Sequence, residues 1–328
     1  MIVFWILAFI VMLAVLVKSS DLLVNSSEKI GLAFKISPFI IGVTIVAIGT
    51  SLPELASSLV ATLRGSTEVV AANAVGSSIA NILLIVGLAA VFARTLVVKR
   101  NLIDLDAPML ITSGALFLFV VWDKTIVFGE GLLLLAGFFV YLLYTLLHKR
   151  DEEGEEMPDN LPIKVHQRKK TKKTKKKRGK IEFKTIAYLV LGVFGLVIGA
   201  NYVIVYMTKI AEHFGVPDSL IAITALAVGT SLPELVVSIK AALGKKYELA
   251  LGNIFGSNIF NILLIAGVPA LFRTLVVDDL TYSVGLPVLA IATLLFVISG
   301  ISKKIHIWEG AMYLLIYILF MLKLIGVL

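Results

Sequence analysis

A carboxylate, two hydroxyls and a proline recur in the same order inside two long apolar stretches of this chain. Residues 49–54 read Gly-Thr-Ser-Leu-Pro-Glu, and residues 229–234 repeat the six letters without change. Placing a charged residue at the centre of a membrane-spanning helix costs roughly 2.5–3.5 kcal/mol even on lenient insertion scales. Because the chain carries this cost twice in equivalent places, both glutamates, Glu54 and Glu234, are predicted to be functional.

The composition supports a membrane protein. Of 328 residues, 59% are hydrophobic, and the apolar residues come in runs of about 20, the length that crosses a bilayer as a helix. There are no cysteines, which excludes disulfides and Cys-ligated metals. The net charge of +8 arises almost wholly from residues 148–180, where 13 Lys/Arg and 6 Asp/Glu give +7. The start of the chain is apolar without a clear cleavage site, so we interpret it as the first span.

The pattern predicts an all-α polytopic membrane protein with ten transmembrane helices. The predicted spans are residues 2–24, 38–63, 71–93, 107–122, 127–147, 183–206, 217–242, 249–272, 282–300 and 306–326. The charged segment separates them into two sets of five. We therefore expect a first five-helix repeat at 1–147, a charged loop at 148–180 and a second repeat at 181–328.

Self-similarity covers both halves of the chain. Residues 44–55 and 224–235 are identical at nine of twelve positions, and 73–85 and 253–265 at nine of thirteen. The two motif regions extend over 42–85 and 222–265. Because five is an odd number of spans, two copies joined by a loop that does not cross must have opposite orientations. This is the inverted-repeat plan of many secondary transporters, whose sites lie near the bilayer midplane.

Lysine and arginine in the short loops predict the orientation, because these residues are enriched on the cytoplasmic side. With both termini outside and the 148–180 loop cytoplasmic, ten basic residues lie inside and five outside. Those inside are Lys29, Lys35, Arg94, Lys99, Arg100, Lys240, Lys245, Lys246, Lys303 and Lys304, and those outside are Arg64, Lys124, Lys209, Arg273 and Lys323. We expect a multi-pass cell-membrane protein. The basic loop is predicted to be a solvated linker that does not bind nucleic acid.

A second polar pattern follows each copy of the first. Asn73, Ser77 and Asn81 are spaced by four residues, which gives one polar stripe on a helix, and Asn253, Ser257 and Asn261 repeat it. Pro53 and Pro233 each lack an N–H, which releases the carbonyls of Gly49 and Gly229 from the helix ladder. Gly76 and Gly256 are small enough for close helix approach.

The two motifs together supply only hard oxygen ligands. They contain two carboxylates, several hydroxyls, amide oxygens and released carbonyls, with no His or Cys. Ca²⁺ and Na⁺ prefer such ligands, whereas zinc and copper do not. Two carboxylates neutralise one Ca²⁺, or two Na⁺ with a third Na⁺ on neutral oxygens. Other acids are expected to be structural: Asp21 lies near the end of the first span, and Glu130 and Glu309 lie near helix starts, where the helix dipole favours an acid.

These paired motifs resemble the two α-repeats of the sodium/calcium exchanger family of the cation/calcium antiporters, and the resemblance covers essentially the whole chain. It implies ten helices in two inverted repeats. It also implies that Glu54 and Glu234 are calcium ligands shared with Na⁺. The other cation-site residues that it implies are Thr50, Thr230, Ser51, Ser231, Ser77, Ser257, Asn81, Asn261 and the backbone carbonyls near Ala47 and Ala227.

The resemblance also carries a departure. Some relatives have Asp where this chain has Asn261, and that acid is associated with potassium co-transport or with a protonatable site. The chain is therefore expected to exchange Na⁺ for Ca²⁺ without potassium. The large regulatory calcium-binding domains of animal members cannot fit into the 148–180 segment.

We expect a secondary antiporter that exchanges Na⁺ for Ca²⁺ by alternating access, works as a monomer in the lipid bilayer and needs no cofactor besides the transported ions. The first alternative is a Ca²⁺/H⁺ antiporter that uses the same carboxylates. A channel is the second. An intramembrane hydrolase based on Ser51 or Ser231 is disfavoured because no histidine lies within a predicted span to act as the base. We therefore expect no enzyme activity.

Overall fold

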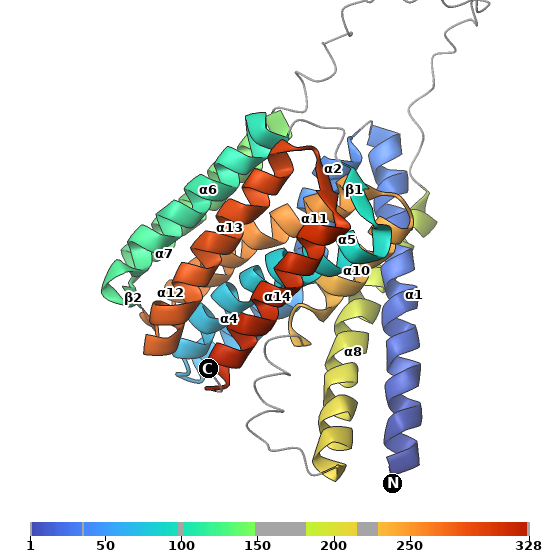
Figure 1. The fold of residues 1–328 in the computed structure, drawn as a ribbon, viewed down its shortest axis with the longest axis horizontal. Helices are drawn as coiled ribbons and strands as arrows, with labels where there is room; N and C mark the ends of the chain where they lie inside the picture. Colours follow the sequence, from blue (N-terminus) through green and yellow to red (C-terminus); the bar gives the residue numbers. More distant parts are fainter. Residues whose placement is uncertain (1, 35, 98–101, 148–181, 215–228, 327–328) are drawn as a thin grey trace, which may run out of the picture.

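The protein is a bundle of long helices, two of which stand side by side at its edge (Figure 1). The computed structural model describes residues 2–34, 36–97, 102–147, 182–214 and 229–326. The two edge helices are α1 (Ile2–Phe34) and α8 (Phe183–His213). They run antiparallel, because Gly199 packs against Leu16 and Gly192 packs against Leu23.

The elements of the first half follow the predicted apolar segments, with π-helical segments labelled η1 and η2. After α1 come α2 (Pro38–Ile41), η1 (Gly42–Val46), α3 (Ala47–Leu63), α4 (Glu68–Ile79), η2 (Ala80–Val86), α5 (Gly87–Ala93), β1 (Thr95–Val97), α6 (Leu102–Val120), the 3₁₀ turn η3 (Val121–Asp123), β2 (Thr125–Ile126) and α7 (Phe128–Leu147).

The second half shares most of this order among its described residues, and its π-helical segments are η5 and η6. After α8 come α10 (Leu232–Leu243), α11 (Tyr247–Ile259), η5 (Phe260–Ile265), α12 (Ala266–Ala270), β3 (Leu275–Val276), η6 (Thr281–Gly285), α13 (Leu286–Ile301), β4 (Lys304–His306) and α14 (Ile307–Leu324).

The all-helical membrane architecture predicted from the sequence is confirmed. Eight helical stretches are long and apolar enough to cross a bilayer, and Ala107–Asp123 is a ninth, shorter one. The one remaining predicted segment, 217–242, is described only from residue 229. The outer surface is apolar, with Phe119 74% and Trp122 73% exposed, as expected of side chains that contact lipid. The largest boundary errors are at two helix ends: the first helix continues ten residues past 24 and α8 continues seven residues past 206, because the polar residues at these ends extend the helix instead of ending it.

The helix directions define two sides of the molecule. The loop side is where α1 ends, α7 ends and α8 begins, and the termini side is where α1 begins and α14 ends. Figure 1 shows the two chain ends on the termini side.

Two short strand pairs join the halves, one on each side. β1 pairs antiparallel with β4, and β2 pairs antiparallel with β3. The repeat relates β1 to β3 and β2 to β4, so the two pairs are equivalent to each other. Lys124 and Lys303 precede β2 and β4 in the same left-handed conformation, with φ of 64° and 56°. This equivalence on opposite sides agrees with an inverted repeat.

Two glutamates that were expected to be structural hold equivalent helix starts. Glu130 Oε2 accepts a hydrogen bond from the backbone N–H of Val127 at 2.9 Å, at the start of α7. Glu309 Oε2 accepts one from His306 N–H at 2.7 Å, at the start of α14. Both carboxylates accept a hydrogen bond from a backbone N–H group that has no partner within its helix. The structural role predicted for these two glutamates is therefore confirmed.

Backbone-to-backbone contact in the centre of the bundle depends on glycine. A Cβ on Gly252 or Gly256 of α11 would collide with the carbonyl oxygens of Phe39 and Val43, which lie in α2 and η1. Close approach was predicted for Gly256, and it is confirmed. At Gly76, no described atom lies within 4 Å of the place that a Cβ would occupy; the counterpart of Val43, residue 223, lies outside the described residues.

Candidate functional site

The two copies of the hexapeptide begin two helices in different ways. In the first repeat α3 is continuous from Ala47 to Leu63 with Pro53 inside it. In the second, residues 230 and 231 form a turn, and α10 starts at Leu232 with Pro233 in its first turn. Proline is tolerated in a first turn because its missing N–H would be unbonded there anyway. Glu234 therefore lies at a helix N-terminus, where the dipole favours a carboxylate.

Both predicted glutamates are buried at the centre of the molecule. Glu54 and Glu234 are each 1% exposed, and the helices that carry them, α3 and α10, pack against each other. Glu234 Oε1 accepts a hydrogen bond from Ser51 Oγ at 2.8 Å. Glu54 Oε2 and Glu234 Oε2 have no hydrogen-bond partner among the described residues. Buried carboxylate oxygens are costly unless paired or bound to a cation, so the pair is suited to hold positive charge.

The polar stripes of α4 and α11 are fixed by two equivalent hydrogen bonds. Asn73 Nδ2 donates to Ser58 Oγ at 3.2 Å, and Asn253 Nδ2 donates to Ser238 Oγ at 3.0 Å. Each bond orients the amide so that its oxygen can accept a hydrogen bond from a hydroxyl group. Asn73 Oδ1 accepts from Ser77 Oγ at 3.4 Å in the first repeat.

Besides the Ser51–Glu234 bond, three hydrogen bonds connect the two repeats through hydroxyl groups in this region. Thr50 Oγ1 donates to Asn253 Oδ1 at 3.2 Å, and Ser51 Oγ lies 3.1 Å from Ser257 Oγ. Ser77 Oγ and Thr230 Oγ1 share a hydrogen bond of 3.1 Å. Residues separated by more than 150 positions thus form one polar layer, as the sequence predicted.

Asn81 and Asn261 lie in the π-helical segments η2 and η5. Such segments are frequent at functional sites, because the wider turn redirects a side chain. Both asparagines are at most 1% exposed. Neither Asn81 polar atom, nor Asn261 Oδ1, has a partner in the described part of the chain. η2 packs against α10 and η5 packs against α3, so each asparagine belongs to a segment in contact with the helix that carries the other repeat's glutamate.

The two repeats are not hydrogen-bonded alike. Ser51 bonds both Glu234 and Ser257, whereas its counterpart Ser231 is 2% exposed and its hydroxyl has no partner among the described residues. The difference accompanies the continuous α3 and the interrupted α10. The layer is therefore built from equivalent residues in two unequal arrangements.

Two residues of the layer were not predicted from the sequence. Ser58 and Ser238, which orient Asn73 and Asn253, were not singled out. Each follows its glutamate by four residues, at the same position in both repeats, and that shared spacing was a usable signal.

The two predicted backbone carbonyls differ in what the structure describes. Ala47 begins α3, and its carbonyl accepts a hydrogen bond from Thr50 Oγ1 at 3.3 Å. Ala227 lies outside the described residues.

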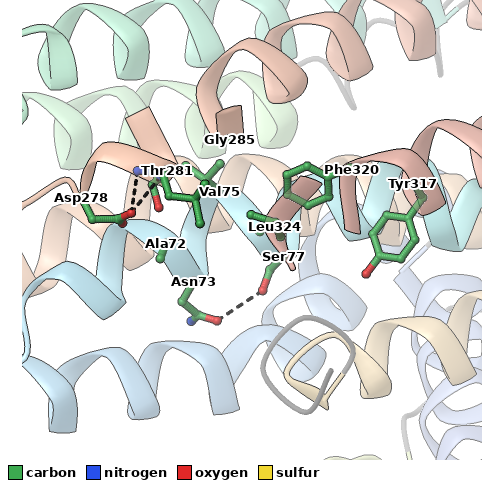
Figure 2. A pocket seen from close by; sticks show the side chains of 12 residues that line it. Ala72, Asn73, Val75, Ser77, Asp278, Thr281, Gly285, Tyr317, Phe320 and Leu324 are labelled. Carbon is green, nitrogen blue, oxygen red and sulfur yellow. Dashed lines mark hydrogen bonds between the residues drawn. The ribbon is translucent and has the colours of Figure 1, made fainter. Parts of the chain in front are cut away.

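A cavity of about 220 Å³ reaches the polar layer from the termini side (Figure 2). It is lined by α4, η6 and α14, and most of its wall is apolar. Asn73 and Ser77 form its polar wall, while Asp278 lies at its outer end. The Asp278 carboxylate accepts hydrogen bonds from Leu280 N–H and Thr281 N–H at 3.0 and 2.9 Å.

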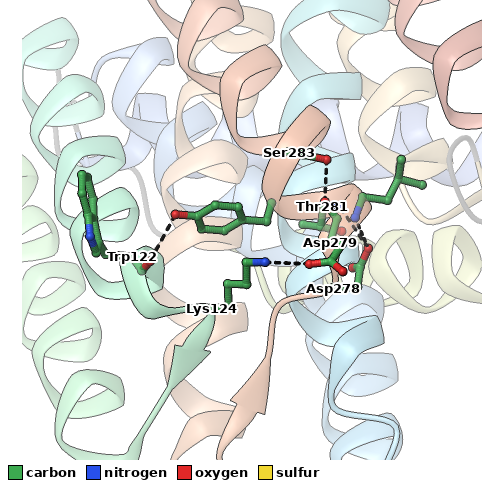
Figure 3. Close-up of polar contacts among 8 residues, drawn as sticks. Trp122, Lys124, Asp278, Asp279, Thr281 and Ser283 are labelled. Atoms are coloured by element: carbon green, nitrogen blue, oxygen red, sulfur yellow. Dashed lines mark hydrogen bonds and ion pairs between the residues drawn. The ribbon is translucent and has the colours of Figure 1, made fainter.

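A charged pair lies beside this outer end (Figure 3). Lys124 Nζ contacts Asp279 Oδ1 at 2.6 Å and lies 5.0 Å from the centre of the Tyr282 ring. The hydrogen bond from Lys124 lowers the pKa of Asp279, and the same bond raises the pKa of Lys124. Both groups therefore stay charged at neutral pH, and the pair links the two halves on the termini side.

Comparison with known proteins decides the family. The family model described as "Sodium/calcium exchanger protein" matches residues 4–147 and 184–326. The chain belongs to the sodium/calcium exchanger family. It is 34% identical to the sodium/calcium exchanger MaX1 of Methanosarcina acetivorans over 95% of this chain and 96% of that protein. It is 33% identical to the inner membrane protein YrbG of Escherichia coli over 88% of this chain and 86% of YrbG.

Solved structures of the sodium-calcium exchanger NCX_Mj share the fold of this exchanger-family protein. One, soaked with zero Na⁺ and Ca²⁺, has a TM-score of 0.79 at 31% identity and covers 99% of this chain and 100% of that one. Another, soaked with 100 mM Na⁺ and 10 mM Sr²⁺, has a TM-score of 0.77 at 31% identity and covers 97% of this chain and 98% of that one. The family resemblance stated from the motifs is confirmed, and this multi-pass membrane protein is of the exchanger type.

Proposed function

We propose that this protein exchanges Na⁺ for Ca²⁺ across the membrane by alternating access. The observation that carries the proposal is the pair of buried glutamates from inverted repeats, each with a carboxylate oxygen that no described group satisfies. A desolvated site with two negative charges needs cations, and its neighbouring oxygens are hydroxyls and amides that suit Ca²⁺ and Na⁺. Membership of the exchanger family supports the same ions.

The proposed ligands are the residues of the polar layer. Glu54 and Glu234 would hold the charge of one Ca²⁺ or be shared among Na⁺ ions. Neutral oxygens would complete the coordination, from Thr50, Thr230, Ser51, Ser231, Ser77, Ser257, Asn81, Asn261 and the carbonyls of Ala47 and Ala227.

Coupling follows from the cost of an empty site. Two uncompensated carboxylates cannot easily cross between the two facing states, so the protein changes state only when loaded with Na⁺ or with Ca²⁺. The competition of both ions for Glu54 and Glu234 then makes the exchange obligatory. We propose that the α1–α8 pair moves against the rest of the bundle, because the first half of α1 is apolar and exposed.

We further propose that both termini lie outside, that the 148–180 loop is cytoplasmic and that a monomer suffices for transport. The excess of basic residues in the loop-side segments supports the orientation. The protein would act on no covalent bond and would need no cofactor.

The deciding measurement is Ca²⁺ uptake into proteoliposomes loaded with Na⁺ and diluted into Na⁺-free or Na⁺-equal buffer, with the pH clamped by an ionophore. Uptake only with an outward Na⁺ gradient is expected. Uptake that ignores Na⁺ and follows an imposed pH gradient would assign the protein to Ca²⁺/H⁺ antiport with the same carboxylates. Uptake with no counter-ion requirement would indicate a channel.

The substitution Glu54→Gln should abolish Ca²⁺ uptake while the protein remains folded, because the amide keeps the shape of the side chain and removes its charge. Glu130→Gln is the matched control. It also neutralises a carboxyl group, but its amide oxygen can still accept from the Val127 N–H, so uptake should persist. Normal uptake by a well-expressed Glu54→Gln protein would overturn the assignment of this site.

A further inference from the structure

Charged residues near the loop-side end of α1 form ion pairs that the transport site does not use. Lys240 Nζ lies 3.0 Å from Asp21 Oδ1. Lys246 Nζ lies 2.6 Å from Glu28 Oε2 and donates to Asn25 Oδ1 at 3.1 Å. Asp21, Asn25 and Glu28 are spaced by four and three residues and so share one face of the helix. We call these contacts the loop-side ion pairs.

These ion pairs connect two parts of the molecule that are packed differently. α1 packs tightly on α8, where a Cβ on Gly192, Gly195 or Gly199 would collide with α1 atoms. The lysines belong to the other part: Lys240 is on α10, the helix that carries Glu234, and Lys246 is in the turn that follows it. The loop-side ion pairs therefore tie the α1–α8 pair to the helix that bears a transport carboxylate.

At the positions equivalent to these ion pairs, the inverted repeat carries uncharged residues. With the offset of 180 residues, the counterparts of Asp21, Asn25 and Glu28 are Asn201, Val205 and Thr208. The counterparts of Lys240 and Lys246 are Val60 and Ser66. None of these five residues is charged. An electrostatic connection of this kind can therefore act only when the loop side is closed.

Water reaches the loop-side ion pairs. The side chains of Lys246 and Glu28 are 25% and 42% exposed, and both line a cavity of about 220 Å³ with Pro38 and Tyr247. Ion pairs exposed to this degree are individually weak, because water and salt compete for the same groups. They can bias an equilibrium between two states several-fold without preventing the transition.

We propose that the loop-side ion pairs hold α1 against α10 and set the equilibrium between the two facing states in favour of the one closed on the loop side. The role in transport rests on the proposed function, but the effect on conformation does not. The interaction is with groups of this chain alone and needs no bound ion.

The absence of native cysteine allows a direct test by thiol labelling. Leu249 is 1% exposed and lines the same cavity as Glu28 and Lys246, so a Leu249→Cys thiol reports opening between α1 and the rest of the bundle on the loop side. Labelling by a membrane-impermeant maleimide is measured in vesicles that expose the loop side. Asp21→Asn together with Glu28→Gln should raise the labelling rate about three- to ten-fold. High salt should raise the rate of the parental protein more than that of the variant.

Two further variants make the result decisive. Glu28→Lys combined with Lys246→Glu exchanges the charges and should bring labelling back toward the parental rate, if Asp21 and Lys240 are unchanged. Asp279→Asn breaks the equally short pair with Lys124 on the termini side and should leave labelling at Leu249→Cys unchanged. An unchanged rate in the doubly neutralised variant, or no recovery with exchanged charges, would overturn the proposal.

Transport measurements separate this inference from the function. In reconstituted protein, the neutralised variant should lower the half-saturating Ca²⁺ concentration on the loop side and raise it on the termini side. If labelling responds as expected while the parental protein shows no Na⁺-driven uptake, the ion pairs control conformation and the proposed transport function is wrong.

Discussion

At Asn261, replacing the side-chain amide by a carboxylate would add a negative charge to the proposed site. Its amide oxygen is buried without a described partner, in the π-helical segment η5 that packs against the helix of Glu54. Replacing the amide by a carboxylate changes the shape of the side chain very little. It would place a third negative charge beside two others in a desolvated layer.

Asn261→Asp is therefore expected to lower the melting temperature by several degrees in cation-free buffer, and Ca²⁺ should reverse the loss. A ligand at 100 times its dissociation constant stabilises the folded state by about 2.7 kcal/mol, enough to detect as a shift in melting temperature. Choline and Mg²⁺ serve as controls, since Mg²⁺ gives up its water reluctantly. Equal melting temperatures for variant and parent without cations would show that Asn261 does not face the carboxylates.

Single residues were predictable where their chemistry was out of place. A glutamate within an apolar run is unusual enough to predict a functional role, and Glu54 and Glu234 do lie in one buried layer. Ser58 and Ser238 were not predicted, because a serine in a membrane helix is commonplace and only its contact with an asparagine gives it a role. The difference in hydrogen bonding between Ser51 and Ser231 could not be predicted either, because identical repeated sequences predict identical environments.

Among the contacts between elements, the crossing of α11 over α2 and η1 leaves no room for a Cβ atom at two glycines. Gly252→Ala would push a methyl group into the Phe39 carbonyl oxygen, which is backbone and cannot rotate away. Overpacking of this kind typically costs about 1–3 kcal/mol. We expect a lower melting temperature and poorer recovery of monodisperse protein from the membrane.

Gly114→Ala on α6 is the control for this substitution. No described atom lies within 4 Å of the Cβ that it would add, so the methyl group should be tolerated. If both variants had the same melting temperature, the close contact at Gly252 would not limit stability.

The helices were predictable because the length of each apolar run indicates the length of the helix. The short elements were not predictable. The two strand pairs contain two or three residues per strand and join positions far apart in the chain, so no local pattern indicates them. No local sequence pattern indicates the π-helical segments either. The end of α1 was misplaced because polarity was taken as the end of the helix, when the helix continues to make ion pairs.

For the whole molecule, the strand pairs should remain intact throughout the transport cycle. Thr125 on β2 is directly opposite Val276 on β3, and paired residues in antiparallel strands have Cα atoms about 4.5–5.5 Å apart, within the range for a disulfide. Oxidised Thr125→Cys/Val276→Cys protein should transport at close to its reduced rate, because both strands lie outside the α1–α8 pair.

The measurement is Ca²⁺ uptake before and after reduction, with cross-linking confirmed by gel mobility after cleavage within the 148–180 segment. The single variant Thr125→Cys controls for oxidation itself. Transport that stops on oxidation and resumes on reduction would mean that the two halves separate on the termini side during the cycle.

Each strand pair joins one half of the chain to the other, and this has a consequence for assembly. Each half of the chain contributes one strand to each pair and one glutamate to the buried layer, so neither half can form the transport site by itself. The two halves of the single chain thus pair with each other as the two antiparallel subunits of an obligate dimer would. Two fragments expressed separately would then be subunits that find each other by the same contacts.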